Sequence, residues 1–149
     1  MNNLAKLCVS VSLLLAAVAL SAQTQPNFTG TWKLNPAKSE LGTGGVTALV
    51  VDIDHKEPIL KYTAKGTAGG QDFEQTETIT TDGKTSRDSQ GINVKAQWDG
   101  ASLVVDGTGD DGSMIYVSRL TLADDGKSLN RVVTQRDDPK PRHEIYEKQ

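Results

Sequence analysis

Residues 28–34 read Phe-Thr-Gly-Thr-Trp-Lys-Leu, a short segment in which Trp32 follows Gly30 by two positions. Threonine, phenylalanine and tryptophan are typical of strands, so the segment predicts a short β-strand. Trp32 brings a large apolar surface to that strand beside the small Gly30. We therefore expect a broad, rigid side chain here to close part of an apolar core.

The residues before this strand have the layout of a secretory signal peptide. Lys6 precedes an apolar run over residues 7–20, and the small residues Ser21 and Ala22 follow the run. The run is too short to span a membrane. We therefore expect residues 1–22 to be removed near Ser21 or Ala22, which leaves a secreted or periplasmic chain without a transmembrane segment.

The remaining residues, 23–149, have the size of one domain with one core. Cys8 is the only cysteine and lies in the predicted signal, so the mature chain is expected to have no disulfide. The chain carries 16 Lys and Arg against 19 Asp and Glu, a formal net charge of −3. Nucleic-acid binding needs clustered positive charge, so this balance does not support a nucleic-acid partner.

Turn dipeptides interrupt the chain repeatedly after Val46. Asp-Gly favours a tight hairpin because glycine adopts positive φ freely and aspartate tolerates it. Such pairs occur at Asp82-Gly83, Asp99-Gly100, Asp111-Gly112 and Asp125-Gly126. Glu57-Pro58 is another break, since proline has no amide proton to donate within a sheet. These breaks predict an antiparallel meander in which each strand pairs with the next.

Between the breaks, apolar residues recur at every second position, which is the period of a strand. The clearest face consists of Ile92, Val94, Ala96 and Trp98. Residues 71–90 differ, because Phe73 and Ile79 are their only large apolar side chains. Strands of this polarity fit a barrel whose interior is partly solvated, or a loosely held edge.

The pattern predicts an all-β fold, an antiparallel up-and-down meander closed into a barrel of about 8–10 strands. Closure removes the strand edges that would otherwise pair with other chains. A β-sandwich is the alternative, but its Greek-key crossings need longer connections than these tight turns provide.

Three short motifs carry a family resemblance. Gly30-Thr31-Trp32 resembles the Gly-x-Trp signature of the calycin superfamily, which includes the lipocalins and the fatty-acid-binding proteins. Gln97-Trp98-Asp99-Gly100 resembles the Lys-Trp-Asp-Gly turn of the fatty-acid-binding branch, and Ile145-Tyr146-Glu147-Lys148 resembles its closing Thr-Tyr-Glu-Lys strand. Residues 28–39 also resemble the start of small secreted bacterial lipocalin-like proteins. The resemblance implies a barrel that binds a small hydrophobic or amphipathic ligand in its interior.

The resemblance also implies that Trp32 closes one barrel end and that an arginine of the last strand lies across its ring as a cation–π partner. Arg142 is the candidate, with Arg131 and Arg136 behind it. Fatty-acid-binding proteins carry a helix pair over the ligand portal after the first strand. Here only residues 35–45, which include a proline and three glycines, are available, so no helical lid is expected.

The aromatic residues expected to face the interior, as walls of a ligand site, are Tyr62, Trp98 and Tyr116. In fatty-acid-binding proteins an Arg-x-Tyr pair on the last strand holds the ligand carboxylate. The corresponding anchor here is Arg142 with Tyr146, while Glu144 occupies the position of the family's arginine. Alternation places all three on one strand face. If that face points inward, Glu144 would repel a carboxylate.

The residues indicate no catalytic set, no metal site and no cofactor. His55 and His143 are the only histidines, and each is expected on the surface among polar neighbours. A protein that binds a ligand inside the barrel is the first hypothesis, a packed barrel acting through its surface is the second, and an enzyme has the least support. The first two differ in whether residues 71–90 surround a void or collapse onto Phe73 and Ile79.

Overall fold

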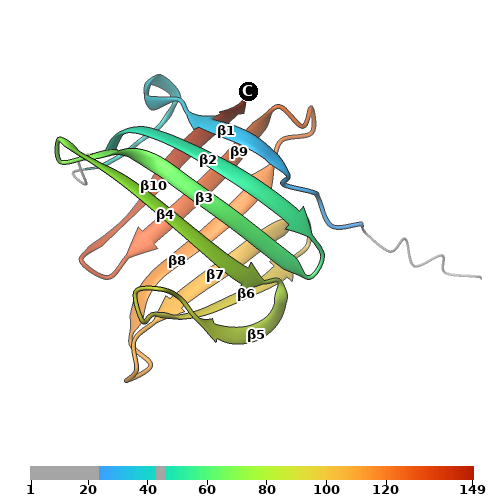
Figure 1. Ribbon diagram of the computed structural model, residues 1–149, viewed down its shortest axis with the longest axis vertical. Coiled ribbons are helices and arrows are strands. Elements are labelled where there is room, and N and C mark those ends of the chain that lie inside the picture. Colours follow the sequence, from blue (N-terminus) through green and yellow to red (C-terminus); the bar gives the residue numbers. More distant parts are fainter. Residues whose placement is uncertain (1–23, 43–45) are drawn as a thin grey trace, which may run out of the picture.

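The computed structural model describes residues 24–42 and 46–149. The predicted signal peptide over residues 1–22, with its cleavage near Ser21 or Ala22, lies outside the described residues. Within them, ten strands form one antiparallel sheet (Figure 1). The strands are β1 (Gly30–Leu34), β2 (Val46–Lys56), β3 (Ile59–Ala68), β4 (Gln71–Thr80), β5 (Asp82–Arg87), β6 (Asn93–Asp99), β7 (Ser102–Thr108), β8 (Met114–Leu122), β9 (Ser128–Gln135) and β10 (Asp138–Lys148).

The sheet follows the chain and curls into a barrel. Its order is β4-β3-β2-β1-β10-β9-β8-β7-β6-β5, so the first strand bonds to the last. β1 pairs Trp32 with Val51 of β2 on one side and with Lys148 of β10 on the other. β4 and β5 are the two ends of this order and share no ladder. The predicted antiparallel up-and-down barrel is confirmed, with one gap between β4 and β5.

The predicted Asp-Gly hairpins are present in three places. Asp99-Gly100 ends β6 and begins the turn to β7, and Asp111-Gly112 and Asp125-Gly126 lie in the β7–β8 and β8–β9 connections. The hairpin prediction for Asp82-Gly83 is wrong. Both residues belong to β5, where the ladder to β6 is irregular and Gly83 has a φ of 78°. The chain turns a corner at Thr81 instead, because β5 pairs with β6 and not with the preceding strand.

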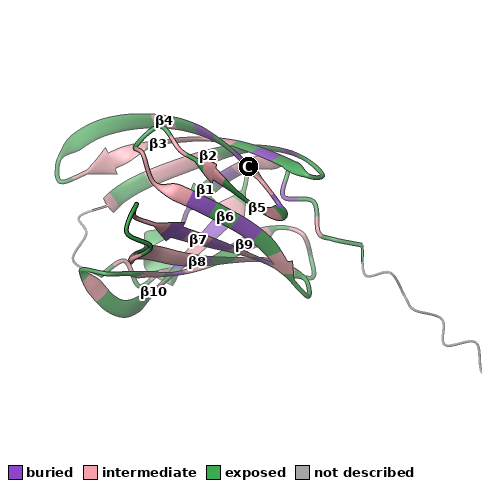
Figure 2. Ribbon diagram, turned by 90° about the horizontal axis from the view of Figure 1, so that it is seen from below, coloured by how far each residue is buried: buried purple, intermediate pink, exposed green. Residues whose placement is uncertain are grey.

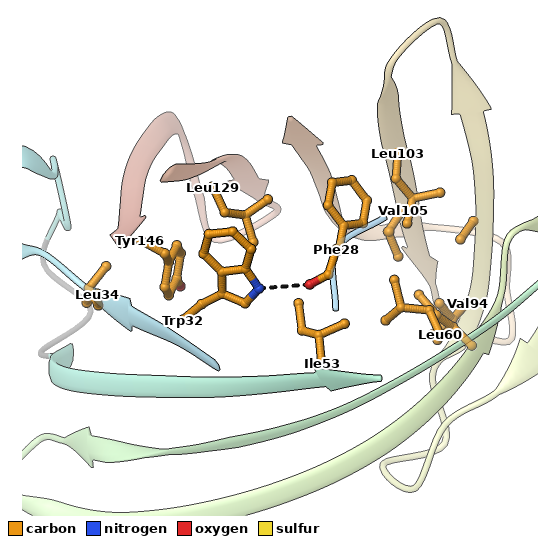
Figure 3. Packing of buried hydrophobic residues seen from close by; sticks show 12 residues of the cluster. Phe28, Trp32, Leu34, Ile53, Leu60, Val94, Leu103, Val105, Leu129 and Tyr146 are labelled. Carbon is orange, nitrogen blue, oxygen red and sulfur yellow. Dashed lines mark hydrogen bonds between the residues drawn. The ribbon is translucent and has the colours of Figure 1, made fainter. Parts of the chain in front are cut away.

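The core at one barrel end is built around Trp32. Trp32 and Phe28 are completely buried, and Trp32 Nε1 donates a hydrogen bond to the Phe28 carbonyl oxygen at 2.8 Å (Figure 3). Lys148 Nζ lies 5.4 Å from the centroid of the Trp32 ring. Gly30 leaves the space for this lysine, since a Cβ there would lie 2.9 Å from Lys148 Cε. The Gly-x-Trp motif thus accommodates a cation over the indole.

The prediction that Arg142 is the cation–π partner of Trp32 is wrong. The β1–β10 register places Lys148 directly opposite Trp32. Arg142 lies further along β10, where it pairs with Val133 of β9. The sequence pattern indicates the last strand as the source of the cation, but the strand register selects the residue.

His55 is buried at the same end, so its predicted surface location is also wrong. Its ring stacks on Phe28 and Trp98, with centroid separations of 5.7 and 6.0 Å. The Phe28 N–H donates to His55 Nδ1 at 3.2 Å, so Nε2 carries the proton that is donated to Glu57 Oε1 at 2.9 Å. Both ring nitrogens of a neutral histidine are therefore satisfied. His143 is exposed, as predicted.

Glu57 connects elements that the sheet ladder does not join. Besides His55, its carboxylate accepts hydrogen bonds from Trp98 Nε1 at 2.9 Å and from Thr81 Oγ1 at 2.5 Å. Thr81 lies at the corner between β4 and β5, Glu57 in the β2–β3 turn and Trp98 near the end of β6. This network closes the barrel end where the β4–β5 ladder is missing.

Among the described residues, no α-helix covers the opposite end. In the described part of the connection between β1 and β2, the one helical turn is a 3₁₀ helix, Pro36–Lys38, in agreement with the predicted absence of a helical lid. None of the helices in residues 24–42 and 46–149 is long and apolar enough to cross a membrane. Buried residues recur along the strands of the barrel (Figure 2), and in β7 every second residue is buried.

Candidate functional site

A cavity of about 440 Å³ lies inside the barrel. Its deep wall is apolar and comes from strands all around the sheet. The buried aliphatic residues of this wall are Ile53, Leu60, Ile79, Val94, Leu103, Val105 and Leu129. They point inward because each occupies the inward position of an alternating strand, and several are drawn in Figure 3. The interior therefore offers an apolar floor.

The cavity becomes more exposed toward the end opposite the cluster of Phe28, His55 and Trp98. Phe73 lines it and is 37% exposed. Gln90 and Gln135 also line it and are exposed. These residues lie near the β3–β4, β5–β6 and β9–β10 turns, which gather at one end of an antiparallel meander. The cavity thus opens at the end without helical cover.

One polar group of the wall joins β8, β9 and β10. Arg131 donates from Nη1 to Glu144 Oε2 at 2.8 Å and from Nε to Ser118 Oγ at 2.9 Å. The Tyr146 hydroxyl donates to the same Glu144 oxygen at 2.7 Å. Arg131, Ser118 and Tyr146 line the cavity, and the Glu144 side chain is 8% exposed. The arginine and the glutamate neutralise each other, so this group presents no net charge to the interior.

A second polar group lies on β4 and in the β5–β6 connection. Glu77, which is 7% exposed, accepts hydrogen bonds from the Ser89 N–H at 3.3 Å, from the Ser89 hydroxyl and from Gln75 Nε2 at 3.2 Å. Burial acts to raise the pKa of Glu77, but these hydrogen bonds outweigh it and lower the pKa below the usual glutamate value. Asp88 also lines the cavity. Glu77 is therefore ionised at neutral pH without a cationic partner among the described residues.

Tyr62 and Tyr116 complete the wall near the mouth. Tyr62 lies opposite Glu77 in the β3–β4 ladder, and Tyr116 lies opposite Gly107 in the β7–β8 ladder. The Tyr116 ring packs against Gly107, in the space that a side chain at position 107 would need. Neither hydroxyl makes a hydrogen bond within residues 24–42 and 46–149, so both are available to a ligand.

All three tyrosines of the chain have raised pKa values. Burial is the main cause in each case, and it raises the pKa of Tyr62 to about 12. For Tyr146, the neighbouring Glu144 carboxylate raises the pKa further. Since the ordinary value is 10.0, we expect little tyrosinate absorbance from the folded protein at that pH. A native titration that is half complete at pH 10 would contradict these assignments.

The raised pKa of Tyr62 also predicts a loss of stability in alkali. The folded state keeps a proton that the unfolded state releases, so the free energy of unfolding falls as the pH rises from 10 to about 12. The wild-type protein should lose about 2 to 3 kcal/mol more over this interval than the Tyr62→Phe variant. Urea unfolding of both proteins at each pH measures the difference, and equal pH profiles would overturn the prediction.

The structure brings three of the five predicted ligand contacts to the cavity: Tyr62, Tyr116 and Tyr146. It does not bring the other two there. Trp98 lies one residue from the end of β6 and packs into the closed barrel end. Arg142 lies beside Gly42, outside the cavity wall. Contact of these three tyrosines with a ligand stays a prediction.

The main polar residues of the cavity were not among the predicted contacts. Arg131, Glu77 and Ser118 line it. The sequence does carry a signal for Arg131, because it stands two positions from the apolar residues Leu129 and Val133 and so shares their strand face. Both of these residues are buried in the structure. Within the described residues, no group of three or more His, Cys, Asp or Glu side chains could hold a metal ion.

Comparisons with known proteins identify the fold. No family model matches the sequence, and neither does any curated protein. The crystal structure of the wild-type fluorescent protein UnaG is similar, with a TM-score of 0.59 and 18% identity over 82% of this chain and 97% of that chain. The crystal structure of the fatty-acid-binding protein in brain tissue of Drosophila melanogaster has a TM-score of 0.52 and 17% identity over 81% of this chain and 99% of that chain. These similarities show the fold alone, an up-and-down β-barrel like those of UnaG and the fatty-acid-binding protein.

A third similar structure is the crystal structure of secretory abundant heat soluble protein 4 from Ramazzottius varieornatus, with a TM-score of 0.57 and 14% identity over 86% of this chain and 99% of that chain. Within the barrel described here, Gly30 and Trp32 lie at the closed end. Gln97–Gly100 forms the end of β6 and the turn after it, and Ile145–Lys148 lies in β10. The three motifs of the resemblance thus occupy the first strand, a hairpin and the last strand.

Proposed function

We propose that this protein binds a small, partly apolar molecule inside its barrel. The cavity of about 440 Å³ carries this proposal, because its apolar floor and its few polar groups near the mouth are typical of small-molecule sites. The similar structure named as a fatty-acid-binding protein supports the same class of function. No reaction is assigned, since the cavity residues form no recognisable pair of nucleophile and base.

The cavity also weighs against the alternative of a packed barrel that acts only through its surface. That alternative expects residues 71–90 to collapse onto Phe73 and Ile79. Instead, Gln75 and Glu77 line the same open space as these two apolar residues. Polar side chains around a void of this size favour an interior ligand.

A cavity-filling variant tests the proposal. Ala64 lines the cavity on β3, whereas the neighbouring Lys65 points outward and pairs with the exposed Glu74 at 3.3 Å. Ala64→Trp should reduce the affinity for the neutral apolar dye Nile red at least about tenfold, because the indole occupies the site. Lys65→Trp adds the same side chain on the outer face and should bind the dye like the wild type.

The expected increase of dye fluorescence is measured by titration of each protein, with circular dichroism as the check of folding. Equal binding by Ala64→Trp and Lys65→Trp would place the dye outside the cavity and contradict the proposal. Native mass spectrometry of the purified protein would then identify any molecule that it carries from the cell.

The proposed setting is outside the cytoplasm, in a periplasmic or secreted location. The N-terminal sequence supports this location, because Lys6, the apolar run over residues 7–20 and the small residues after it follow one another as in a secretory signal peptide. Mass determination of the protein from a periplasmic fraction tests this, since removal of the signal near Ser21 or Ala22 shortens the chain. An unprocessed chain in the cytoplasm would contradict it.

A further inference from the structure

The cavity has an uneven charge distribution that bears on its ligand. Arg131 is the one basic side chain that lines it within the described residues, and Glu144 already neutralises this arginine at 2.8 Å. Glu77 and Asp88 line it as well, and no lysine, arginine or histidine nitrogen of the described chain forms an ion pair with either. The cavity therefore carries an excess of negative charge near its mouth.

The surroundings of Glu77 make this charge persistent. Its hydrogen-bond donors, the Ser89 N–H and hydroxyl and the Gln75 amide, are all neutral. They satisfy the carboxylate oxygens but leave the net charge in a site shielded from bulk water. A charge in such a place interacts more strongly with a ligand than an exposed charge does. A cationic ligand group would gain from this interaction, and an anionic group would lose.

Asp88 and the tyrosines extend the same environment. Asp88 Oδ1 accepts hydrogen bonds from the backbone N–H groups of Gln90 and Ile92 at 2.9 and 2.8 Å, which again are neutral donors. Tyr62 and Tyr116 present aromatic rings and free hydroxyls to the cavity, and aromatic faces attract cations. Carboxylates and aromatic rings around one opening form a setting suited to an ammonium group.

We propose that the ligand is a cationic amphiphile, with its apolar part on the floor of Leu60, Val94 and Leu103 and its amine or ammonium head near Glu77 and Asp88. This inference rests on the proposed function, since it specifies the ligand class of the same cavity. It separates this barrel from binders of fatty carboxylates. A carboxylate would have to displace Glu144 from Arg131 and would approach two uncompensated acidic groups.

Three probes with the same twelve-carbon chain test the inference in competition with Nile red: dodecyltrimethylammonium, dodecan-1-ol and laurate. We expect the ammonium to displace the dye at a concentration at least about tenfold lower than laurate, with the alcohol between them. The permanent charge of the trimethylammonium group excludes an effect of its own protonation. All probes are used below the concentrations at which they form micelles.

Charge-removing variants assign the preference to the residues. Glu77→Gln and Asp88→Asn keep an oxygen acceptor. Each should reduce several-fold the preference for the ammonium, which is the laurate concentration divided by the ammonium concentration needed to displace the dye. Glu74→Gln is the matched control on β4, because Glu74 is exposed and faces outward toward Lys65. It should keep the wild-type ratio. If Glu77→Gln does not fold, the Asp88→Asn variant still tests whether an acidic group of the cavity causes the preference for the ammonium.

The outcomes separate the two proposals. If Nile red and all three probes fail to bind, the proposed function is wrong and this inference falls with it. If the probes bind but laurate is equal to or better than the ammonium, the barrel is a binding protein and only the inference of a cationic ligand is wrong. A preference for the ammonium that both variants leave unchanged would also overturn the inference.

Discussion

Replacement of Trp32 by alanine should lower the free energy of unfolding by about 3 to 5 kcal/mol, the range for a large aromatic side chain removed from a core. Trp32 is completely buried, and its Nε1 donates to the Phe28 carbonyl at 2.8 Å. The variant leaves a cavity at the closed barrel end and an acceptor without its donor. Such a loss approaches the whole stability of many single domains, about 5 to 15 kcal/mol.

Urea unfolding followed by circular dichroism measures this effect. Trp32→Phe is the graded control, since it keeps an aromatic ring but removes the indole N–H, and a smaller loss of about 1 to 2 kcal/mol is expected. A loss below about 1 kcal/mol for Trp32→Ala would show that the closed end does not depend on this side chain.

The second large effect concerns the ion pair inside the barrel. Arg131→Met should lower the free energy of unfolding by about 3 kcal/mol, because Glu144 is left buried without its cation. The Tyr146 hydroxyl still donates to Glu144 but supplies no charge. Removal of both charges in Arg131→Met with Glu144→Leu should recover most of the loss, since apolar residues of similar size replace a buried pair at little cost.

Arg119→Met is the matched control for this experiment. Arg119 pairs with Asp99 at 2.6 Å, but both side chains are well exposed, so its loss should stay below about 1 kcal/mol. If the single variant Arg131→Met and the double variant are equally destabilised, the two residues are not energetically coupled. That result would contradict the role assigned to the pair.

Local sequence features predict much of this fold. Asp99-Gly100 and Asp125-Gly126 suit tight turns by their own backbone preferences, whatever the rest of the chain does. The alternation through Val94 and Ala96 likewise indicates one buried strand face, and both residues are buried. An up-and-down meander connects neighbours in sequence, so these local signals are sufficient for nearly all of its strand order.

The sequence misleads where the closed barrel, and not the local segment, decides the surroundings of a residue. His55 stands among charged residues and looks exposed, but Phe28 and Trp98 enclose its ring in the fold. Asp82-Gly83 has the composition of a hairpin turn, but β4 and β5 share no ladder and the pair begins a strand. Distant contacts with Phe28 and Trp98 decide the place of His55, whereas the gap between β4 and β5 in the closed barrel decides that Asp82-Gly83 is not a turn.

The sequence alone determines the class of this protein: a β-meander with a tryptophan at one end, polar middle strands and a resemblance to calycin barrels. The tertiary structure decides which cation covers Trp32, because only the β1–β10 register selects Lys148 over Arg142. It also decides that the barrel keeps a cavity and that Glu144 neutralises Arg131, while Glu77 has no cationic partner among the described residues. The contact of Lys148 with Trp32 depends on pairing between β1 and β10, strands more than a hundred residues apart, and no local pattern encodes that register.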